Sequence, residues 1–353
     1  MKYILLVNAY VNQESKVQAM NPTIQDVAKA ANVSIATVSR VLNNQPGFSE
    51  KTRLKVLEAI EELGYQPNAI ARGLVNRNTG TIGVLFPSVS GMLSAEVLHG
   101  IEARAHEQGY SVIVCNTAAD PEKTLRYIQL LSEKRVDGLV FVSEEVTEDY
   151  YSAFQRMGVP VALVLTQSYK FPLPYVKVDD SHAAYTATRH LIDSGHKHIG
   201  MISGNPTELM AGMGRIEGFK RALLEAGLPY SDSLVETSTS FTYENGVENF
   251  PKLIERHPET TAVFAASDEI AIGAIAAAYK MDIRIPEDVS IIGYDNLKHA
   301  EMSIPPLTTI AQPFQRMGEK AIEMVLAMKQ EKNAESAILS HKLVERESVK
   351  KIN

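Results

Sequence analysis

Residues 23–43 read TIQDVAKAANVSIATVSRVLN and contain two runs of helical periodicity separated by a short break. Thr23 and Ser34 stand directly before the two runs, where a hydroxyl can cap the first turn of a helix. Apolar side chains recur in each run at the spacing of one helix face. They are Ile24, Val27, Ala28 and Ala31 in the first run and Val38, Val41 and Leu42 in the second. The stretch predicts a helix-turn-helix unit, whose second helix, Ile35 to Leu42, can enter the major groove of DNA.

A third helix is predicted from Ser49 to Leu63, before a stop at Gly64. In the second helix, Arg40 is long enough to bind a guanine edge through two bonds, and Ile35 and Ala36 can touch a thymine methyl group. The candidate DNA contacts are Thr23, Ser34, Ile35, Ala36, Thr37, Ser39, Arg40 and Asn43. The periodicity alone also fits a small three-helix bundle with a solvated polar face.

Charge is unevenly distributed along the chain. The net charge is −7, yet residues 20–78 hold seven basic and five acidic groups, and residues 79–353 carry −10. An acidic body repels polyanions, so DNA contact is confined to the basic part. We therefore expect a DNA-binding head at residues 20–66, a linker at 67–78 and a ligand-binding body from residue 79 onward.

Length and composition predict two or three folded units in a reducing compartment. The single cysteine, Cys115, excludes an intrachain disulfide, and no apolar run approaches the roughly 20 residues that span a bilayer. The expected location is therefore the cytoplasm, with no membrane partner. Residues 1–19 show little periodicity and are expected to be a disordered, dispensable extension. The serine-nucleophile and phosphate-loop patterns are absent from the sequence, so we expect no enzyme, no cofactor and no metal site.

The body alternates predicted strands and helices from Thr81 to Gly293. Such alternation specifies parallel sheets covered by helices on both faces, and two such sets predict two lobes. Lobe 1 is expected at residues 79–178 plus 311–330, and lobe 2 at residues 179–308 plus the C-terminal segment. Ligands of open α/β sheets bind beyond the carboxyl ends of the strands, so the two lobes predict a cleft.

Three charged residues near the predicted strand ends are candidate ligand contacts. Arg215 begins a helix, where its guanidinium fork suits two adjacent hydroxyls or a carboxylate. Asp268 and Asp295 each follow a predicted strand. A simple helix cap at Asp268 and a turn residue at Asp295 are the structural alternatives.

The head and linker closely resemble the LacI/GalR family of bacterial transcriptional repressors. The resemblance rests on residues 23–43 and on the run Gly64-Tyr65-x-Pro67-Asn68-Ala69-x-Ala71-Arg72-x-Leu74. It implies a hinge helix that orders on double-stranded operator DNA, with contacts from Asn68, Ala71 and Arg72. It also implies that Leu74 wedges into the minor groove. A homodimer follows from the resemblance, and two heads on adjacent half-sites also bind better than one.

The body resembles the periplasmic binding protein type I fold that this family carries behind its head. The stretch Pro305 to Phe314 looks like the family's return crossover between lobes. By resemblance, Arg215 and Asp295 are the strongest effector contacts, followed by Asp268, Gln312 and Phe314. The implied effector is a small molecule of the sugar class, because an aromatic ring beside paired polar groups suits a sugar, although the same fold in this family also accepts purines and other small molecules.

One departure concerns residues 91–94. Family members often carry Asn-Pro-Phe-Phe where this chain has Gly91-Met92-Leu93-Ser94, so we expect Met92, Leu93 and Ser94 to replace an aromatic wall of the pocket. The head is also similar to the catabolite-control branch, which responds mainly to a phosphorylated carrier protein and usually lacks an arginine at the position of Arg215. Arg215 favours a direct effector, and a protein corepressor is the alternative. A second alternative is a sugar-binding protein without specific DNA binding. The operator sequence and the sign of the effector's action stay open.

Overall fold

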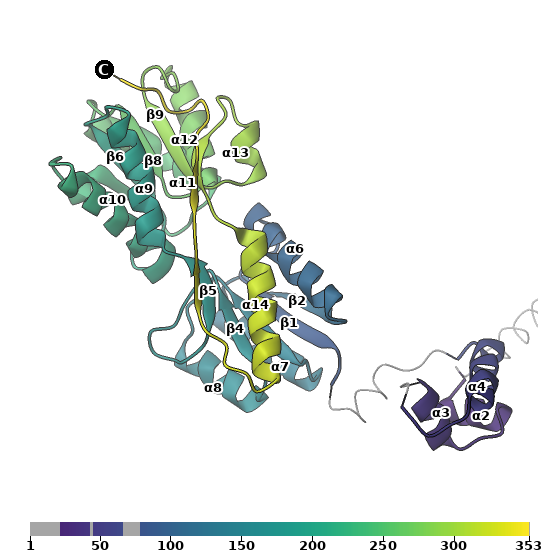
Figure 1. Ribbon diagram of the computed structural model, residues 1–353. Coiled ribbons are helices and arrows are strands. Elements are labelled where there is room, and N and C mark those ends of the chain that lie inside the picture. Colours follow the sequence, from purple (N-terminus) through teal and green to yellow (C-terminus); the bar gives the residue numbers. More distant parts are fainter. Residues whose placement is uncertain (1–21, 43–44, 66–77, 353) are drawn as a thin grey trace, which may run out of the picture. The chain divides into compact units, whose positions relative to one another are not determined.

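The computed structural model describes residues 22–42, 45–65 and 78–352. The chain divides into two compact units, with the boundary between Thr79 and Gly80. The first unit contains the helical head and the second contains the α/β body (Figure 1). The predicted fold class, a helix-turn-helix head followed by a body of two parallel-sheet lobes, is confirmed.

The head consists of α2 (Ile24–Ala30), α3 (Ile35–Leu42) and α4 (Glu50–Leu63). Its core is small and aliphatic, with Val27, Val38 and Val56 fully buried where the three helices meet. The hydroxyl of Thr23 accepts from the backbone N–H of Asp26, whose carboxylate accepts from the Thr23 backbone in return. A capping box of this kind satisfies two N–H groups that lack intrahelical partners. The helix-turn-helix unit is therefore stabilised locally as well as by its core.

The third helix begins after Ser49, whose hydroxyl accepts from the N–H of Thr52. It ends at Gly64, where a φ of +61° suits a residue without a Cβ atom. The buried face of α4 is formed by Val56 and Ala59, whereas Leu54 and Leu57 are exposed. The helix boundaries therefore follow the sequence signals, although all three of its leucines, Leu63 included, lie outside the head core.

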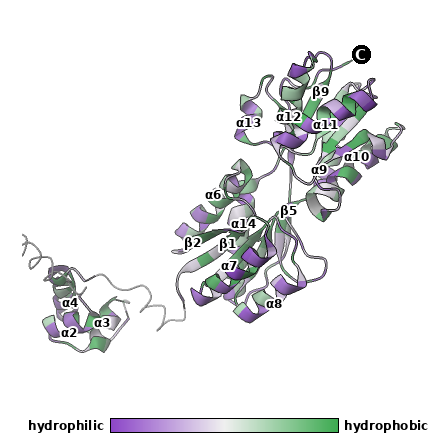
Figure 2. Cartoon of the chain, turned by 180° about the vertical axis from the view of Figure 1, so that it is seen from behind, coloured by the Kyte–Doolittle hydropathy of each residue, from purple (hydrophilic) through white to green (hydrophobic). Residues whose placement is uncertain are grey.

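Lobe 1 of the body is built on a six-stranded sheet with the order β11-β5-β4-β3-β1-β2. Its strands are β1 (Thr81–Phe86), β2 (Ser111–Asn116), β3 (Gly138–Val142), β4 (Val161–Val164), β5 (Tyr175–Val178) and β11 (Ala337–Leu339). Its helices are α6 (Met92–Glu107), α7 (Pro121–Glu133), α8 (Glu148–Met157) and α14 (Phe314–Lys329). All pairings in this sheet are parallel, as expected for strands joined by crossover helices. The central strands β3 and β4 consist of apolar residues, whereas the covering helices contain both hydrophilic and hydrophobic residues (Figure 2).

Lobe 2 repeats the plan with the strand order β12-β10-β9-β8-β6-β7. Its strands are β6 (Ile199–Ser203), β7 (Val235–Thr237), β8 (Ala262–Ala265), β9 (Ser290–Asp295), β10 (Thr308–Ala311) and β12 (Lys342–Val344). Its α-helices are α9 (Asp180–Asp193), α10 (Gly214–Glu225), α11 (Tyr243–Arg256), α12 (Asp268–Lys280) and α13 (Lys298–Met302). Two short helical turns, η1 (Leu209–Met213) and η2 (Asp232–Leu234), precede α10 and β7. Only β12 pairs antiparallel among the described strands, along β10.

Three crossovers connect the lobes. They lie between β5 and α9, between β10 and α14, and between β11 and β12. The sequence alone predicts the C-terminal segment in lobe 2, but its strand β11 pairs with β5 in lobe 1 and only β12 joins lobe 2. Three residues per strand are too few for a periodicity signal, so the sequence could not show this division. In the described part of the chain, no helix is long and apolar enough to cross a membrane.

Candidate DNA-reading surface and interlobe ligand site

The outer surface of α3 carries the side chains expected to face DNA. Ile35, Ala36 and Arg40 are exposed, and Thr37 is half-buried. The hydroxyl of Ser34 accepts from the backbone N–H of Thr37 at 3.1 Å and so caps the helix. An apolar pair followed by an arginine at the start of a recognition helix can contact base edges without disturbing the head core.

Several of the predicted DNA contacts have other roles or lie elsewhere. The hydroxyl of Thr23 is engaged with Asp26 in the capping box. Ser39 is half-buried on α3. The remaining predicted contacts, Asn43, Asn68, Ala71, Arg72 and Leu74, lie outside the described residues.

In lobe 2, Arg215 occupies a buried polar cluster at the start of α10. Its Nε and Nη2 donate to Oδ1 of Asp180 at 3.2 and 3.1 Å, and its Nη1 donates to the carbonyl oxygen of Ala266. The guanidinium carbon lies 3.8 Å from the centroid of the Tyr294 ring. Burial disfavours the charge, but Tyr294, Asp180 and Asp295 more than compensate, so the pKa of Arg215 is raised. Arg215 is therefore charged and already held by protein groups.

Asp180 joins Arg215 to the first crossover. Its Oδ2 lies 3.1 Å from Nζ of Lys177, which is buried at the end of β5, and its Oδ1 also accepts from the hydroxyl of Tyr294 at 3.2 Å. Two buried cations thus share one carboxylate. Lys177 and Asp180 are not among the site residues predicted from the sequence. The Asp179-Asp180 pair directly after a strand was the signal that could have found Asp180.

Asp295 lies at the carboxyl end of β9, next to this cluster. Its Oδ1 accepts from Nε2 of Gln312 at 2.8 Å, so two predicted effector contacts are hydrogen-bonded to each other. Burial raises the pKa of Asp295 to about 7, against the opposing effects of Arg215 and Gln312. The residue has a φ of +117°, an uncommon backbone conformation that recurs at ligand sites.

Asp268 is fully buried and has a protein donor on each carboxyl oxygen. The hydroxyl of Thr309 donates to Oδ1 at 2.5 Å, and the backbone N–H of Leu297 donates to Oδ2 at 2.7 Å. Burial, with a contribution from Asp295, raises the pKa of Asp268 well above its ordinary value. The geometry of Asp268 therefore supports the turn after β9 and leaves no oxygen directed at solvent.

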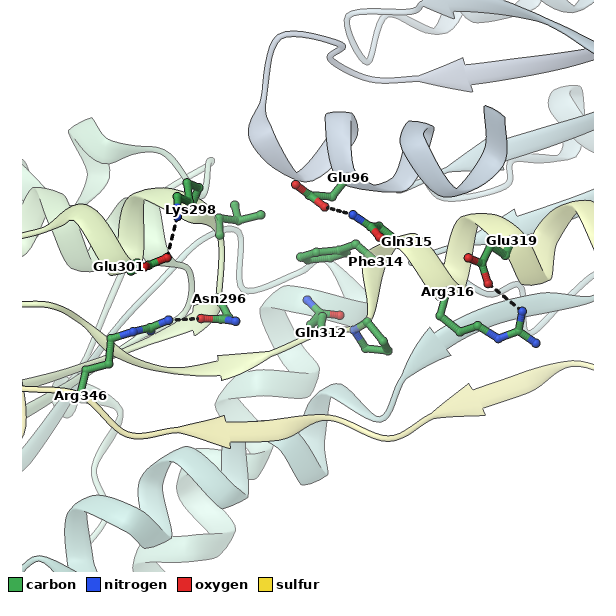
Figure 3. Close-up of a pocket in the computed structure, with 12 residues that line it drawn as sticks. Glu96, Asn296, Lys298, Glu301, Gln312, Phe314, Gln315, Arg316, Glu319 and Arg346 are labelled. Atoms are coloured by element: carbon green, nitrogen blue, oxygen red, sulfur yellow. Dashed lines mark hydrogen bonds and ion pairs between the residues drawn. The ribbon is translucent and has the colours of Figure 1, made fainter. Parts of the chain in front are cut away.

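A pocket of about 600 Å³ opens where the second crossover meets the two lobes. Lobe 1 contributes residues from α6 and α14, and lobe 2 contributes residues from α13 and the strand ends (Figure 3). The lining residues are Glu96, Asn296, Leu297, Lys298, Glu301, Gln312, Pro313, Phe314, Gln315, Arg316, Glu319 and Arg346. Within this set, the Oε1 atom of Gln312 is buried and has no hydrogen-bond partner among the described residues. The pocket therefore offers an unfilled acceptor beside the ring of Phe314.

The residues 92–94 do not line this pocket. Met92 is exposed at the start of α6, and its sulfur lies 3.0 Å from Nδ1 of His299. Leu93 packs against the apolar cluster of lobe 1, and the hydroxyl of Ser94 donates to the carbonyl oxygen of Ser88 at 2.6 Å. Gln312 and Phe314 thus line the pocket and Asp295 is bonded to Gln312, whereas Arg215, Asp268 and residues 92–94 at the start of α6 do not line it.

The geometry defines a two-part regulator, with a helix-turn-helix head and a two-lobed body that can hold a ligand. A family model described as "Bacterial regulatory proteins, lacI family" matches residues 23–68. A second one, described as "Periplasmic binding proteins and sugar binding domain of LacI family", matches residues 79–347. The chain belongs to the LacI family of bacterial regulatory proteins. It is a DNA-binding transcriptional regulator and not an enzyme.

Individual relatives are similar over nearly the whole chain. Catabolite control protein A of Priestia megaterium is 40% identical over 94% of this chain and 100% of its own. The transcriptional repressor PurR of Vibrio parahaemolyticus is 37% identical over 94% of this chain and 99% of its own. Two of the solved structures that match contain a bound ligand. A lac repressor dimer bound to operator and the anti-inducer ONPF has a TM-score of 0.83 at 26% identity, and the regulator CelR in a cellobiose complex has 0.72 at 31%. Each alignment covers 93% of this chain and 99% of the other.

Proposed function

We propose that this regulator is a homodimeric, cytoplasmic repressor of carbohydrate-utilisation genes, and that a sugar-class effector in the interlobe cleft sets its operator affinity. The observation that carries the proposal is the buried Oε1 of Gln312, which has no hydrogen-bond partner in the described part of the chain and belongs to a pocket shared by both lobes. A sugar hydroxyl is a donor that fits this acceptor, and the neighbouring Phe314 offers an apolar ring face. The cellobiose complex of CelR supports the same ligand class.

Neither Asp295 nor Arg215 lines this pocket, but Asp295 is hydrogen-bonded to Gln312 and Arg215 lies in the buried polar cluster next to Asp295. A carboxylate and a guanidinium can bind the paired hydroxyls of a sugar through bidentate hydrogen bonds. Because Arg215 already binds Asp180, a ligand that reaches it must share its remaining N–H donors. A ligand bound at this position would contact both lobes and favour their closure, and such coupling between two sites is typically worth about 1–3 kcal/mol.

The proposed dimer has a candidate surface on lobe 2. Tyr279 and Ile304 are 83% and 89% exposed and line one hollow in which apolar side chains such as Ile275 and Ile283 stand beside the charged residues Asp282, Arg284 and Glu287. Large apolar side chains gathered at a surface fit a protein interface. The substitution Ile304→Asp is expected to shift the chain from dimer to monomer in sedimentation velocity, and an unchanged dimer would exclude this surface.

The test of function is selection of bound sequences from random DNA duplexes by the purified full-length protein. The selection is repeated with a panel of sugars and sugar phosphates. We expect an enriched pseudo-palindrome whose occupancy one of these compounds changes, and the direction of the change gives the sign of regulation. The absence of any enriched sequence would contradict the proposal and favour a sugar-binding protein without specific DNA binding.

A protein corepressor is the second candidate, because catabolite control protein A is 40% identical to this chain. The corresponding arm of the experiment adds a phosphorylated carrier protein to the selected duplex and regulator. Enrichment that no sugar changes, together with tighter binding in the presence of the phosphorylated carrier, would favour this alternative. Enrichment that a sugar changes without the carrier would favour the direct effector.

A further inference from the structure

The turn after β9 reaches from lobe 2 into lobe 1. Leu297 belongs to this turn, yet its side chain is buried within the apolar cluster of lobe 1 that includes Phe314 and Val97. The rest of that cluster comes from the sheet of lobe 1, α6 and α14. Leu297 is thus an apolar connection between lobes that is separate from the three chain crossovers. Opening the lobes at this side would expose its side chain to water, which is unfavourable.

A second contact lies close to the first in the sequence. Nδ1 of His299 lies 3.0 Å from the sulfur of Met92, so α13 of lobe 2 touches the first turn of α6 in lobe 1. Met92 and Glu96 are four residues apart on α6 and share one helix face. Glu96 lines the interlobe pocket together with Lys298 and Glu301 of α13 (Figure 3). The same face of α6 is therefore turned toward α13 along more than one helical turn.

The turn is anchored firmly to lobe 2. Oδ2 of Asp268 accepts from the backbone N–H of Leu297 at 2.7 Å. Arg346 donates through Nη2 to Oδ1 of Asn296 and through Nη1 to the carbonyl oxygen of Leu307, each at 2.7 Å. The bond to Asp268 fixes the backbone of Leu297 itself, and the bond from Arg346 holds the side chain of the preceding residue, so the position of Leu297 depends on the position of lobe 2.

We propose that Leu297 and His299 form an interlobe latch, positioned by Asp268, that holds lobe 2 against α6 and α14 and sets the balance between open and closed lobes. The latch borders the pocket in which Gln312 and Phe314 lie, because Leu297 lines that pocket. A ligand there would change the free energy of the latch directly. The contact between the lobes does not depend on the proposed function. The effect of this contact on DNA binding rests on the proposed function.

The contact is tested by crosslinking the full-length protein. In a Cys115→Ser background, Met92→Cys and His299→Cys are combined and treated with a short bismaleimide. We expect an intrachain link between the two peptides, identified by mass spectrometry of the protease digest under dilute conditions. The matched control joins Met92→Cys with Leu224→Cys on α10, which lies apart from α6 in both overall views and should give no intrachain link (Figures 1 and 2). Equal linking in both pairs, or in neither, would overturn the contact.

The energetic role is tested by hydrogen exchange of Leu297→Ala in the full-length chain. We expect amides of α6 and of the first turn of α14 to exchange about tenfold faster or more, because removing a buried leucine favours opening. Leu297→Met keeps the apolar contact and should restore most of the protection. Leu253→Ala is the control, since Leu253 is buried wholly within lobe 2 and its loss should spare lobe 1. Faster exchange in lobe 1 for both alanine variants, or for neither, would contradict the latch.

The regulatory role is tested with the duplex obtained by selection. Leu297→Ala is expected to change the Kd for that duplex at least fivefold, whereas Leu253→Ala should leave it nearly unchanged. If crosslinking and exchange support the contact but the Kd does not change, the latch does not control DNA binding and that part of the proposal is wrong. If no duplex is selected, the proposed function fails while the crosslinking result still decides the contact.

Discussion

Asp295 makes the stability of the body depend on pH. Its carboxyl has a pKa of about 7 in the folded chain and about 3.9 when unfolded, so the folded state binds the proton more tightly. The stabilisation from this proton is fully present below about pH 4 and is lost as pH rises through about 7. We expect the difference in unfolding free energy between wild type and Asp295→Asn to change by about 2–4 kcal/mol between these limits.

Urea unfolding of both proteins at several pH values checks this expectation. The asparagine keeps an acceptor for Gln312 Nε2 but cannot titrate, so the difference reports the titration of Asp295 together with its effect on the pKa of Asp268. Curves for wild type and Asp295→Asn that run parallel from pH 4 to 8 would show that Asp295 titrates normally.

Arg215 is expected to combine a stabilising role with an effector role. Arg215→Ala leaves Asp180 and Lys177 buried without the guanidinium, so we expect a loss of about 3–5 kcal/mol in unfolding free energy. The effector response should disappear while binding to the selected duplex remains. The control is Arg221→Ala, an exposed arginine on the same helix, with an expected stability change within about 0.5 kcal/mol. If Arg215→Ala keeps both the full unfolding free energy and the effector response, Arg215 does not belong to the effector site.

At the scale of single residues, the sequence predicts helix caps well and ligand contacts only in outline. Thr23 and Ser49 cap the helices that follow them because a cap depends on residues three positions away. The surroundings of Arg215 depend on Asp180, Ala266 and Tyr294, which lie on other elements. No local pattern reports such contacts, so the sequence identified Arg215 without showing that the protein already occupies its donors.

At the scale of elements, the packing of α6 on α14 requires small residues. A Cβ atom on Gly318 would lie 2.2 Å from the carbonyl oxygen of Val97, and one on Gly100 would lie 1.9 Å from that of Gln315. The two helices therefore touch through their backbones. We expect Gly318→Ala to cost about 1–3 kcal/mol by forcing the helices apart, despite the better helix propensity of alanine.

Thermal unfolding of Gly318→Ala beside Gly91→Ala measures this effect. Gly91 precedes α6 with a φ of −76°, and a Cβ atom there meets nothing within 4 Å, so its substitution should be nearly neutral. Because α14 carries the Phe314 end of the pocket, Gly318→Ala should also alter effector response. Equal Tm values for the two variants would mean that α14 can shift without cost.

The sequence predicts long elements reliably and short ones poorly. The main helices and buried strands of both lobes have enough residues to show a period. The strands β11 and β12 have three residues each, and their sheet membership is set by the crossover between lobes rather than by their own pattern. The turn at Leu297 is equally invisible in sequence, although it carries the interlobe contact.

At the scale of the whole molecule, the uneven charge separates the two functions, and the boundary at Thr79 allows them to be tested apart. The head region is mildly basic, whereas residues 79–353 carry −10. We expect the fragment 78–353 to show no retention of duplex DNA between about 50 and 200 mM salt, because its charge repels phosphates. The full-length chain should bind the selected duplex with an affinity that falls steeply over the same range.

Fluorescence anisotropy with a labelled duplex measures both proteins, and calorimetry with the selected sugar checks that the fragment still binds ligand. Comparable DNA affinity for fragment and full chain would place the DNA contact on the body and contradict the assignment of Ile35, Ala36 and Arg40.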